Sequence, residues 1–246
     1  MPKIYLSPST QEANPYINGG TEEEVMNQLA DAMIPYLNAN GISYIRNTPQ
    51  MTAASSIRQS NEGNYDLHLA LHSNAAPESN SGQVRGTDIY YYPSSVKGKQ
   101  EANLLADSFK TIYPDPNKVR ALPITSLGEV SKTKAPGILI ETAYHDNPED
   151  AQWIKDNIDN MARVIVESLT KYFGMPFITP VAPYPGVVNI RWGHLNLRDK
   201  PSTNSQIIGT LFNGQRITIL GRYGDWYSVE TPSGIGFVSS DYVQSY

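Results

Sequence analysis

His72, Glu22 and Glu141 are the residues whose types and positions could carry chemistry in this chain. The sequence has no cysteine and only four histidines, so thiolate metal sites and cysteine nucleophiles are excluded. A histidine and a carboxylate that meet at an open position can hold Zn²⁺. A second carboxylate can take a proton from the metal-bound water and pass it to a leaving amine. These residues therefore suggest metal-assisted hydrolysis.

Three apolar runs must position these residues. Residues 3–7, 65–72 and 137–141 each predict a buried strand, and polar side chains follow all three runs. A helix is predicted to begin at Thr21, whose hydroxyl can cap the acidic first turn. The carboxyl ends of parallel strands meet at one edge of a sheet, and the helix after the first strand begins there. We therefore expect Glu22, His72 and Glu141 at one edge.

The other patterns up to residue 175 also alternate between strand and helix. Pro35 is expected to kink or shorten the first helix. The alternation predicts an α/β fold with a mostly parallel sheet flanked by helices. The further elements are strands at 42–46 and 86–92, the latter at an edge or antiparallel, and helices at 51–61, 100–113 and 147–173.

A change in composition after residue 175 predicts a second domain. Four prolines in residues 176–186 predict a stiff, extended linker after a first domain of residues 1–175. Short alternating segments separated by turn residues follow, without a helical pattern. They predict a small all-β barrel over residues 187–246.

Charge and hydropathy limit the partners. The net charge of −5 argues against nucleic acid, and no apolar run approaches the ~20 residues that a membrane span needs. Residues 1–6 do not resemble a secretory signal peptide, because their apolar run is short and is followed by Ser7 and Pro8. The low content of charged residues, 17%, and the 16 tyrosines suit carbohydrate or peptide ligands, or simply β structure rich in turns.

Residues 3–174 resemble the zinc-dependent N-acetylmuramoyl-L-alanine amidases. These α/β enzymes hydrolyse the cell wall between the lactyl group of the glycan and the stem peptide. Three segments carry the resemblance in the order of the family, namely residues 65–75 (YDLHLALHSNA), 86–92 (GTDIYYY) and 135–151 (APGILIETAYHDNPEDA).

The resemblance implies roles for individual residues. It implies that His72 and Glu22, with Glu23 as the alternative to Glu22, bind zinc. Glu141 would be the catalytic base, and His145 would help to stabilise the oxyanion. His68 is expected to be a packing residue, because four residues along a strand span roughly 13 Å, too far from His72 for one ion.

One zinc ligand of the family is missing. Thr10, or a neighbour of it, stands where the family has a histidine after the first strand. Loss of one protein ligand should weaken zinc binding strongly unless another group replaces it. The candidate replacements are His145, Glu12 and Gln11.

Residues 187–246 resemble the bacterial SH3-like domains. The matching segments include residues 195–198, 208–211, 224–229 and 236–243. The resemblance implies binding of cell-wall peptide, which would raise the local substrate concentration for the first domain. Candidate surface aromatics are Trp192, Trp226, Tyr227 and Tyr242, although Trp226 is better interpreted as a core residue.

Together these features predict a bacterial peptidoglycan amidase that uses Zn²⁺. We expect it to be a monomer that acts in the cell wall or outside the cell. It would reach the wall after cell lysis or through an export signal that is not part of this sequence. The alternative is a non-catalytic wall-binding or regulatory protein that keeps the fold with a degenerate metal site. A test of metal binding separates the two.

Overall fold

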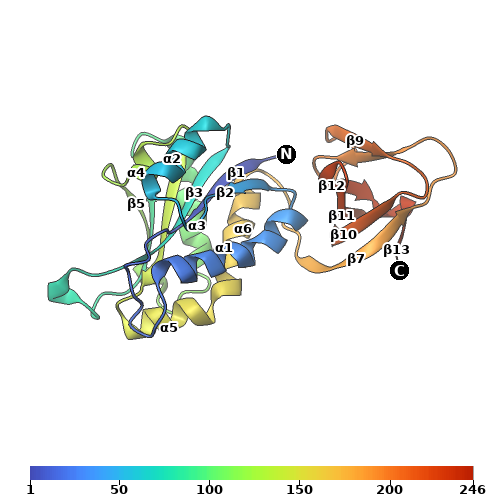
Figure 1. Ribbon diagram of the computed structural model, residues 1–246. Helices are drawn as coiled ribbons and strands as arrows, with labels where there is room; N and C mark the ends of the chain where they lie inside the picture. The colour runs from blue at the N-terminus through green and yellow to red at the C-terminus, as the bar shows by residue number, and fades with distance from the viewer. Residues whose placement is uncertain (246) are drawn as a thin grey trace. The chain divides into compact units, whose positions relative to one another are not determined.

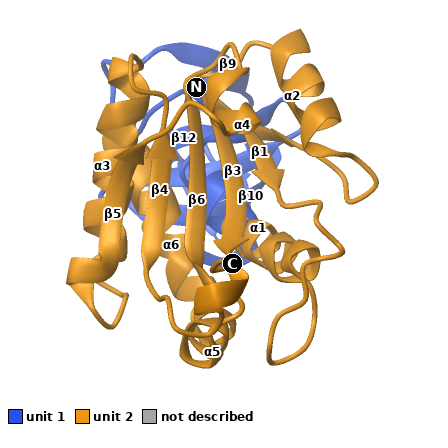
Figure 2. Ribbon diagram, turned by 90° about the vertical axis from the view of Figure 1, so that its left-hand side faces the viewer, with its two compact units in different colours: residues 1–2, 34–43, 173–246 blue, residues 3–33, 44–172 orange. Residues whose placement is uncertain are grey.

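The computed structural model describes residues 1–245 as two compact units. One unit comprises residues 3–33 and 44–172, and the other comprises residues 1–2, 34–43 and 173–246 (Figure 2). Helix α1, Glu22–Ala39, continues past Pro35 and contributes to both units. The sequence predicted an unbroken first domain over residues 1–175, so the assignment of residues 34–43 to the second unit was not expected.

A six-stranded sheet with flanking helices forms the first unit (Figure 1). The strand order is β2-β1-β3-β6-β4-β5, and Figure 2 shows β1, β3, β6, β4 and β5 side by side. Strands β1 and β3 are parallel, as are β3 and β6 and β4 and β5, whereas β4 and β6 are antiparallel. The mostly parallel sheet is therefore confirmed. The strands are β1 Lys3–Pro8, β2 Ser43–Arg46, β3 Leu67–Asn74, β4 Thr87–Tyr91, β5 Val119–Pro123 and β6 Gly137–Tyr144.

Strand β4 was predicted to be antiparallel or to lie at an edge of the sheet. It is antiparallel to β6, but it is not an edge strand, because β5 pairs with it on the other side. The long predicted helix 147–173 is two helices, which meet at Asn157. Helices α3 and α6 pack together, and the short α4 contacts α2, β3 and β6. Besides α1, the helices are α2 Ala53–Glu62, α3 Val96–Phe109, α4 Gly128–Ser131, α5 Pro148–Asp156 and α6 Ile158–Tyr172. No helix among residues 1–245 has both the length and the apolar character of a membrane span.

The second unit contains a seven-stranded antiparallel sheet in the order β13-β7-β10-β11-β12-β8-β9. Strand β7, Pro180–Val188, pairs with β10, so most of the expected linker is in fact a strand. Tyr227, expected on the surface, is buried in the core of this sheet with Leu197, Ile219 and Val229. The other strands are β8 Leu195–Arg198, β9 Ile207–Leu211, β10 Arg216–Tyr223, β11 Trp226–Thr231, β12 Gly234–Ser239 and β13 Val243–Ser245.

Candidate active site

The register of the sheet places His72 beside Glu141. The two residues are paired across β3 and β6, near the carboxyl ends of these parallel strands. Asp88 on β4 pairs with Glu141 from the other side, and Arg120 on β5 pairs with Asp88. Directly paired residues of neighbouring strands lie on the same face of a sheet. Polar residues from four strands therefore form one row across this face.

Glu22 reaches the end of this row from the first turn of α1. Its Oε1 lies 2.8 Å from His72 Nδ1, and Asn14 Nδ2 donates to its Oε2 at 2.7 Å. Glu22 is 1% exposed, whereas Glu23 and Glu24 are not buried. Of the two alternatives from the sequence, Glu22 is the residue that contacts His72. The first-turn position also favours a carboxylate through the helix dipole.

Glu129 contacts His72 from the other side, and the sequence analysis missed it. Its Oε2 lies 3.0 Å from His72 Nε2. Its Oε1 accepts from Ser7 Oγ at 2.5 Å and lies 3.3 Å from His68 Nε2. Glu129 belongs to α4, a helix of four residues, which is too short to show a periodic pattern. Its sequence context, with Ser126, Ser131 and Lys132 close by, does not distinguish it from a surface acid.

His68 is fully buried, as expected of an internal residue, but it also belongs to this polar network. Its Nδ1 lies 2.9 Å from Ser60 Oγ, and its Nε2 faces Glu129. A buried polar group needs hydrogen-bond partners to offset the loss of water. His68 and His72 therefore share Glu129 as their common acceptor.

The close contacts between charges separate the pKa values of the three groups. Burial disfavours the imidazolium form of His72, but hydrogen bonds to Glu129 and Glu22 raise its pKa to about 10. Burial alone would raise the pKa of Glu129, yet the two histidines lower it to about 2. The pKa of Glu22 is likewise lowered, because the contact with His72 outweighs burial. Without a metal, His72 is thus an imidazolium held between two carboxylates, and a metal at Nδ1 would have to displace the proton of that nitrogen.

Glu141 differs from these carboxylates because it forms no ion pair with any of the residues that the structure describes. Its Oε2 is buried and has no hydrogen-bond partner among residues 1–245. Burial raises the pKa of Glu141 to about 7; His72 opposes the shift, and Glu22, Asp88 and Glu129 add to it. A carboxyl group with such a pKa can both accept and release a proton near neutral pH.

His145 lies near the same edge but has other contacts. Its Nδ1 is 3.0 Å from Ser73 Oγ and 2.9 Å from the Ser73 carbonyl oxygen, and its ring stacks on Tyr16. The proposed catalytic role of His145, and its role as a replacement zinc ligand, remain predictions.

Among the candidate replacements for the missing histidine, Gln11 comes nearest to His72. Its Nε2 lies 3.5 Å from His72 Nδ1, and its Oε1 accepts from Asn14 Nδ2. Glu12 is exposed, and no group of three or more His, Asp or Glu side chains in the described part of the chain is placed to hold a metal. Thr10, Gln11, His72 and Glu129 line a cavity of about 430 Å³.

The residues present offer a divalent cation two ligand atoms, one from a histidine and one from a carboxylate. His72 Nδ1 and Glu22 Oε1 converge, while His72 Nε2 is held by a carboxylate, as in many metal-binding histidines. The side-chain amide of Gln11 is the nearest third group, but its nitrogen faces His72 and its oxygen accepts from Asn14, so the amide would have to turn to ligate a divalent cation through its oxygen. Glu141 is adjacent in the sheet but engaged by none of these groups.

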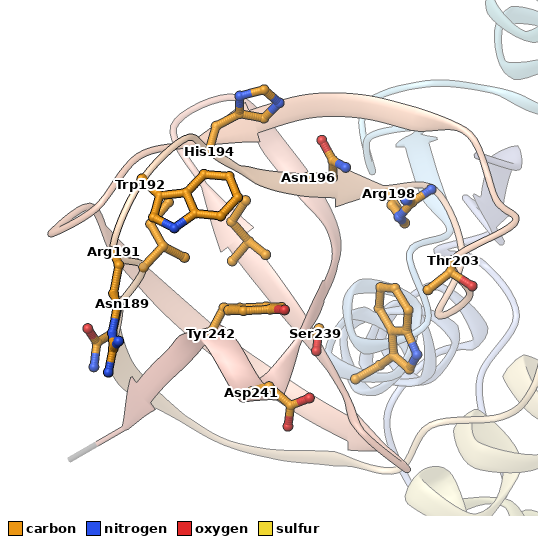
Figure 3. A pocket seen from close by; sticks show the side chains of 13 residues that line it. Asn189, Arg191, Trp192, His194, Asn196, Arg198, Thr203, Ser239, Asp241 and Tyr242 are labelled. Atoms are coloured by element: carbon orange, nitrogen blue, oxygen red, sulfur yellow. The ribbon is translucent and has the colours of Figure 1, made fainter.

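A second hollow, of about 630 Å³, lies on the seven-stranded sheet of the other unit. Figure 3 shows Trp192 and Tyr242 at one end of it and Thr203 at the other. Trp192 is 88% exposed and Tyr242 is 49% exposed. Trp226 also lines the hollow and packs only partly against Phe237 and its neighbours, so it is not simply a core residue.

Each of the two units resembles a known protein family. The N-acetylmuramoyl-L-alanine amidase family model matches residues 9–171, and the bacterial SH3 domain model matches residues 193–244. A curated relative, an uncharacterized protein of Clostridium perfringens, is 23% identical over 203 residues, which is 77% of this chain. The chain spans 60% of the length of that relative.

Solved structures share the fold of the first unit. The amidase AmiC2 of Nostoc punctiforme covers 70% of this chain and 97% of its own, with a TM-score of 0.61 and 18% identity. The match with the catalytic domain of the CD27L endolysin, which targets Clostridia difficile, covers 70% of this chain and 98% of the endolysin domain. Its TM-score is 0.56 and the sequence identity is 23%. Because the amidase model matches well over half of the chain, this protein belongs to the N-acetylmuramoyl-L-alanine amidase family.

Proposed function

We propose that this protein is a peptidoglycan hydrolase that cleaves the amide bond between N-acetylmuramic acid and L-alanine, with zinc at His72 and Glu22. One observation carries the proposal. His72 Nδ1 and Glu22 Oε1 converge at 2.8 Å, and Glu141, next to His72 in the sheet, keeps a buried oxygen without a partner. Family membership and the similarity to amidase structures support the reaction class.

Glu141 is the proposed base of the reaction. Its unpartnered Oε2 is free to accept a proton from the attacking water, and its raised pKa lets it return that proton to the departing nitrogen of L-alanine. His72 and Glu22 are the proposed ligands, and Gln11 is the proposed third donor. When bound, zinc would supply polarisation of the amide carbonyl and a water of lowered pKa.

The SH3-like unit is the proposed wall-binding module. Its hollow has aromatic walls at Trp192, Trp226 and Tyr242, which provide stacking surface for sugar rings or peptide groups. Binding there would keep the amidase unit at a high local concentration of substrate. The cell wall is therefore the proposed site of action, and peptidoglycan the proposed partner.

A direct test is to digest purified peptidoglycan with the full chain and to identify the products. An amidase releases stem peptides with a free L-alanine amino group and glycan without peptide. Glu141→Gln keeps the shape of the side chain but removes the base, so the rate should fall about 10²–10⁴-fold. Equal rates for the two proteins would contradict the role of Glu141.

The second candidate function is a non-catalytic wall-binding protein. It is favoured by the absence of the family histidine at the position of Thr10. The same digestion decides between the two. If the parent protein binds the wall but releases no amino groups above background, the non-catalytic function is correct.

A further inference from the structure

Glu129 has no role in the proposed reaction, yet it is a buried acid in contact with His72. It is 5% exposed, and both of its carboxylate oxygens are engaged. Oε2 faces His72 Nε2, and Oε1 faces Ser7 and His68. A carboxylate so fully engaged is not available as a base.

The two nitrogens of the His72 ring have different partners. Nε2 is held by Glu129 at 3.0 Å, and Nδ1 faces Glu22 at 2.8 Å. A histidine that binds a metal through one nitrogen generally donates the other N–H to a carboxylate or carbonyl, which fixes the tautomer and the orientation of the ring. Glu129 lies on the side away from Glu22 and so occupies this supporting place.

We propose that Glu129 is a positioning residue that holds His72 through its Nε2–H, so that Nδ1 faces Glu22 and the cation. This inference rests on the proposed cation site. It makes the affinity of that site for zinc depend on Glu129, a residue of α4. This helix contributes no proposed ligand or base.

The surroundings of Glu129 explain how it stays in place. Ser7 reaches it from β1 and His68 from β3, and His68 is in turn fixed by Ser60 of α2. The carboxylate thus has donors from two strands besides His72. A supporting group whose own position is fixed transmits that position to the residue it contacts.

The test is a zinc titration of the full chain by competition with a chromogenic chelator. Glu129→Gln keeps the size of the side chain and removes the charge, and we expect about 10–100-fold weaker zinc binding. Glu167→Gln on α6, which removes a partly exposed partner of Arg163 and Lys171, is the matched control and should bind zinc like the parent. Ser7→Ala removes one hydrogen-bond donor to Glu129 and should weaken zinc binding by a smaller factor. This variant tests the inference if Glu129→Gln does not fold.

A second readout separates positioning from a purely structural role. In zinc-loaded protein with ¹⁵N-labelled histidine, the His72 ring should show a proton on Nε2 in the parent and lose this single tautomer in Glu129→Gln. If folded Glu129→Gln binds zinc as tightly as the parent, the inference is wrong and the proposed function stands. If Glu167→Gln weakens zinc binding equally, the inference is also wrong. A parent protein that binds no zinc overturns both the inference and the proposed cation site.

Discussion

The two candidate sites of this protein are built in opposite ways. The candidate active site of the first unit consists of buried charges, with His72 between Glu22 and Glu129 at distances of 2.8 and 3.0 Å. The hollow of the SH3-like unit consists of exposed aromatics such as Trp192 over a separate apolar core. Buried charges are tolerated only with partners, whereas exposed aromatics need none. Removal of one residue should therefore disturb the first site as a whole and the second only locally.

Replacing a histidine in each unit should give the largest contrast. His72→Ala leaves Glu22 and Glu129 buried without their cation, so we expect a loss of about 3–5 kcal/mol in the free energy of unfolding. His194→Ala removes an exposed side chain and should change that free energy by less than about 0.5 kcal/mol. Urea denaturation of both variants measures the difference. Zinc analysis of protein purified without chelator should also show loss of the metal only in His72→Ala; equal zinc in the two variants would contradict the assignment of His72.

A glycine-to-alanine substitution in each unit should also change stability by different amounts, although the difference is smaller than for the histidines. A Cβ at Gly137 would collide with the Glu129 carbonyl oxygen and lie 2.9 Å from Val130 Cα, so Gly137→Ala must displace α4. We expect a loss of about 1–3 kcal/mol in stability, together with weaker zinc binding. In the seven-stranded sheet, the new Cβ of Gly209→Ala would meet only Leu197, at 3.5 Å from Cδ2 and 3.7 Å from Cβ, so this substitution should be nearly neutral. Thermal unfolding of the two variants checks this, and equal shifts in Tm would argue against the tight packing around α4.

The hollow can be tested without disturbing the fold. Trp192→Ala removes an exposed aromatic ring from the wall of the hollow and should weaken sedimentation with purified cell walls about tenfold, as expected of an aromatic hot spot. Phe212→Ala is the matched control, because Phe212 is 62% exposed but does not line the hollow. If both variants sediment like the parent, wall binding does not depend on this surface.

A buried acid that lacks the partners of Glu129 should make the stability of the protein depend on pH. Glu101 on α3 has one hydrogen bond, from Ser168 on α6, and burial raises its pKa to about 8. Since the folded-state pKa lies above the unfolded value near 4.5, the stability that this group contributes is complete at low pH. It should decline as the pH rises to about 8, by on the order of 1 kcal/mol per pH unit.

Glu101→Gln removes this titration, so its stability should depend less on pH between 5 and 8 than that of the parent. Urea denaturation at several pH values measures the slope. Glu24→Gln, which changes an exposed acid in α1, should keep the parental slope. Identical slopes for Glu101→Gln and the parent would show that Glu101 does not titrate in this range.

Much of the amidase site could be predicted because its residues end regular elements. His72 and Glu141 end the continuous apolar runs of β3 and β6, and Glu22 follows a capping residue at the start of a helix, so their types and order indicate a common edge. Glu129 could not be found in this way, since a single helical turn has no periodicity. The choice of Gln11 over Glu12 depends on a loop, where the side-chain direction does not follow from a pattern.

In the second unit, too, the sequence patterns did not predict every feature, but for different reasons. Its short strands and turns were recognisable, but prolines 180, 183 and 185 suggested a linker where β7 pairs with β10 and β13. Proline lacks an N–H and is tolerated in strands where that donor is not needed. Tyr227 and Trp226 are adjacent in an alternating strand, and only the packing decides which of them is buried.

By itself, the sequence determined the α/β class of the first unit, the β class of the second, and that His72, Glu141 and either Glu22 or Glu23 would meet at the sheet edge. These features follow from local periodicity and from the shared direction of parallel strands. Only the tertiary structure decided that His72 is held between Glu22 and Glu129, and that Glu141 Oε2 has no hydrogen-bond partner within the described residues. Such contacts join residues up to 122 positions apart, such as Ser7 and Glu129. Their energy depends on burial and distance, which no local pattern encodes.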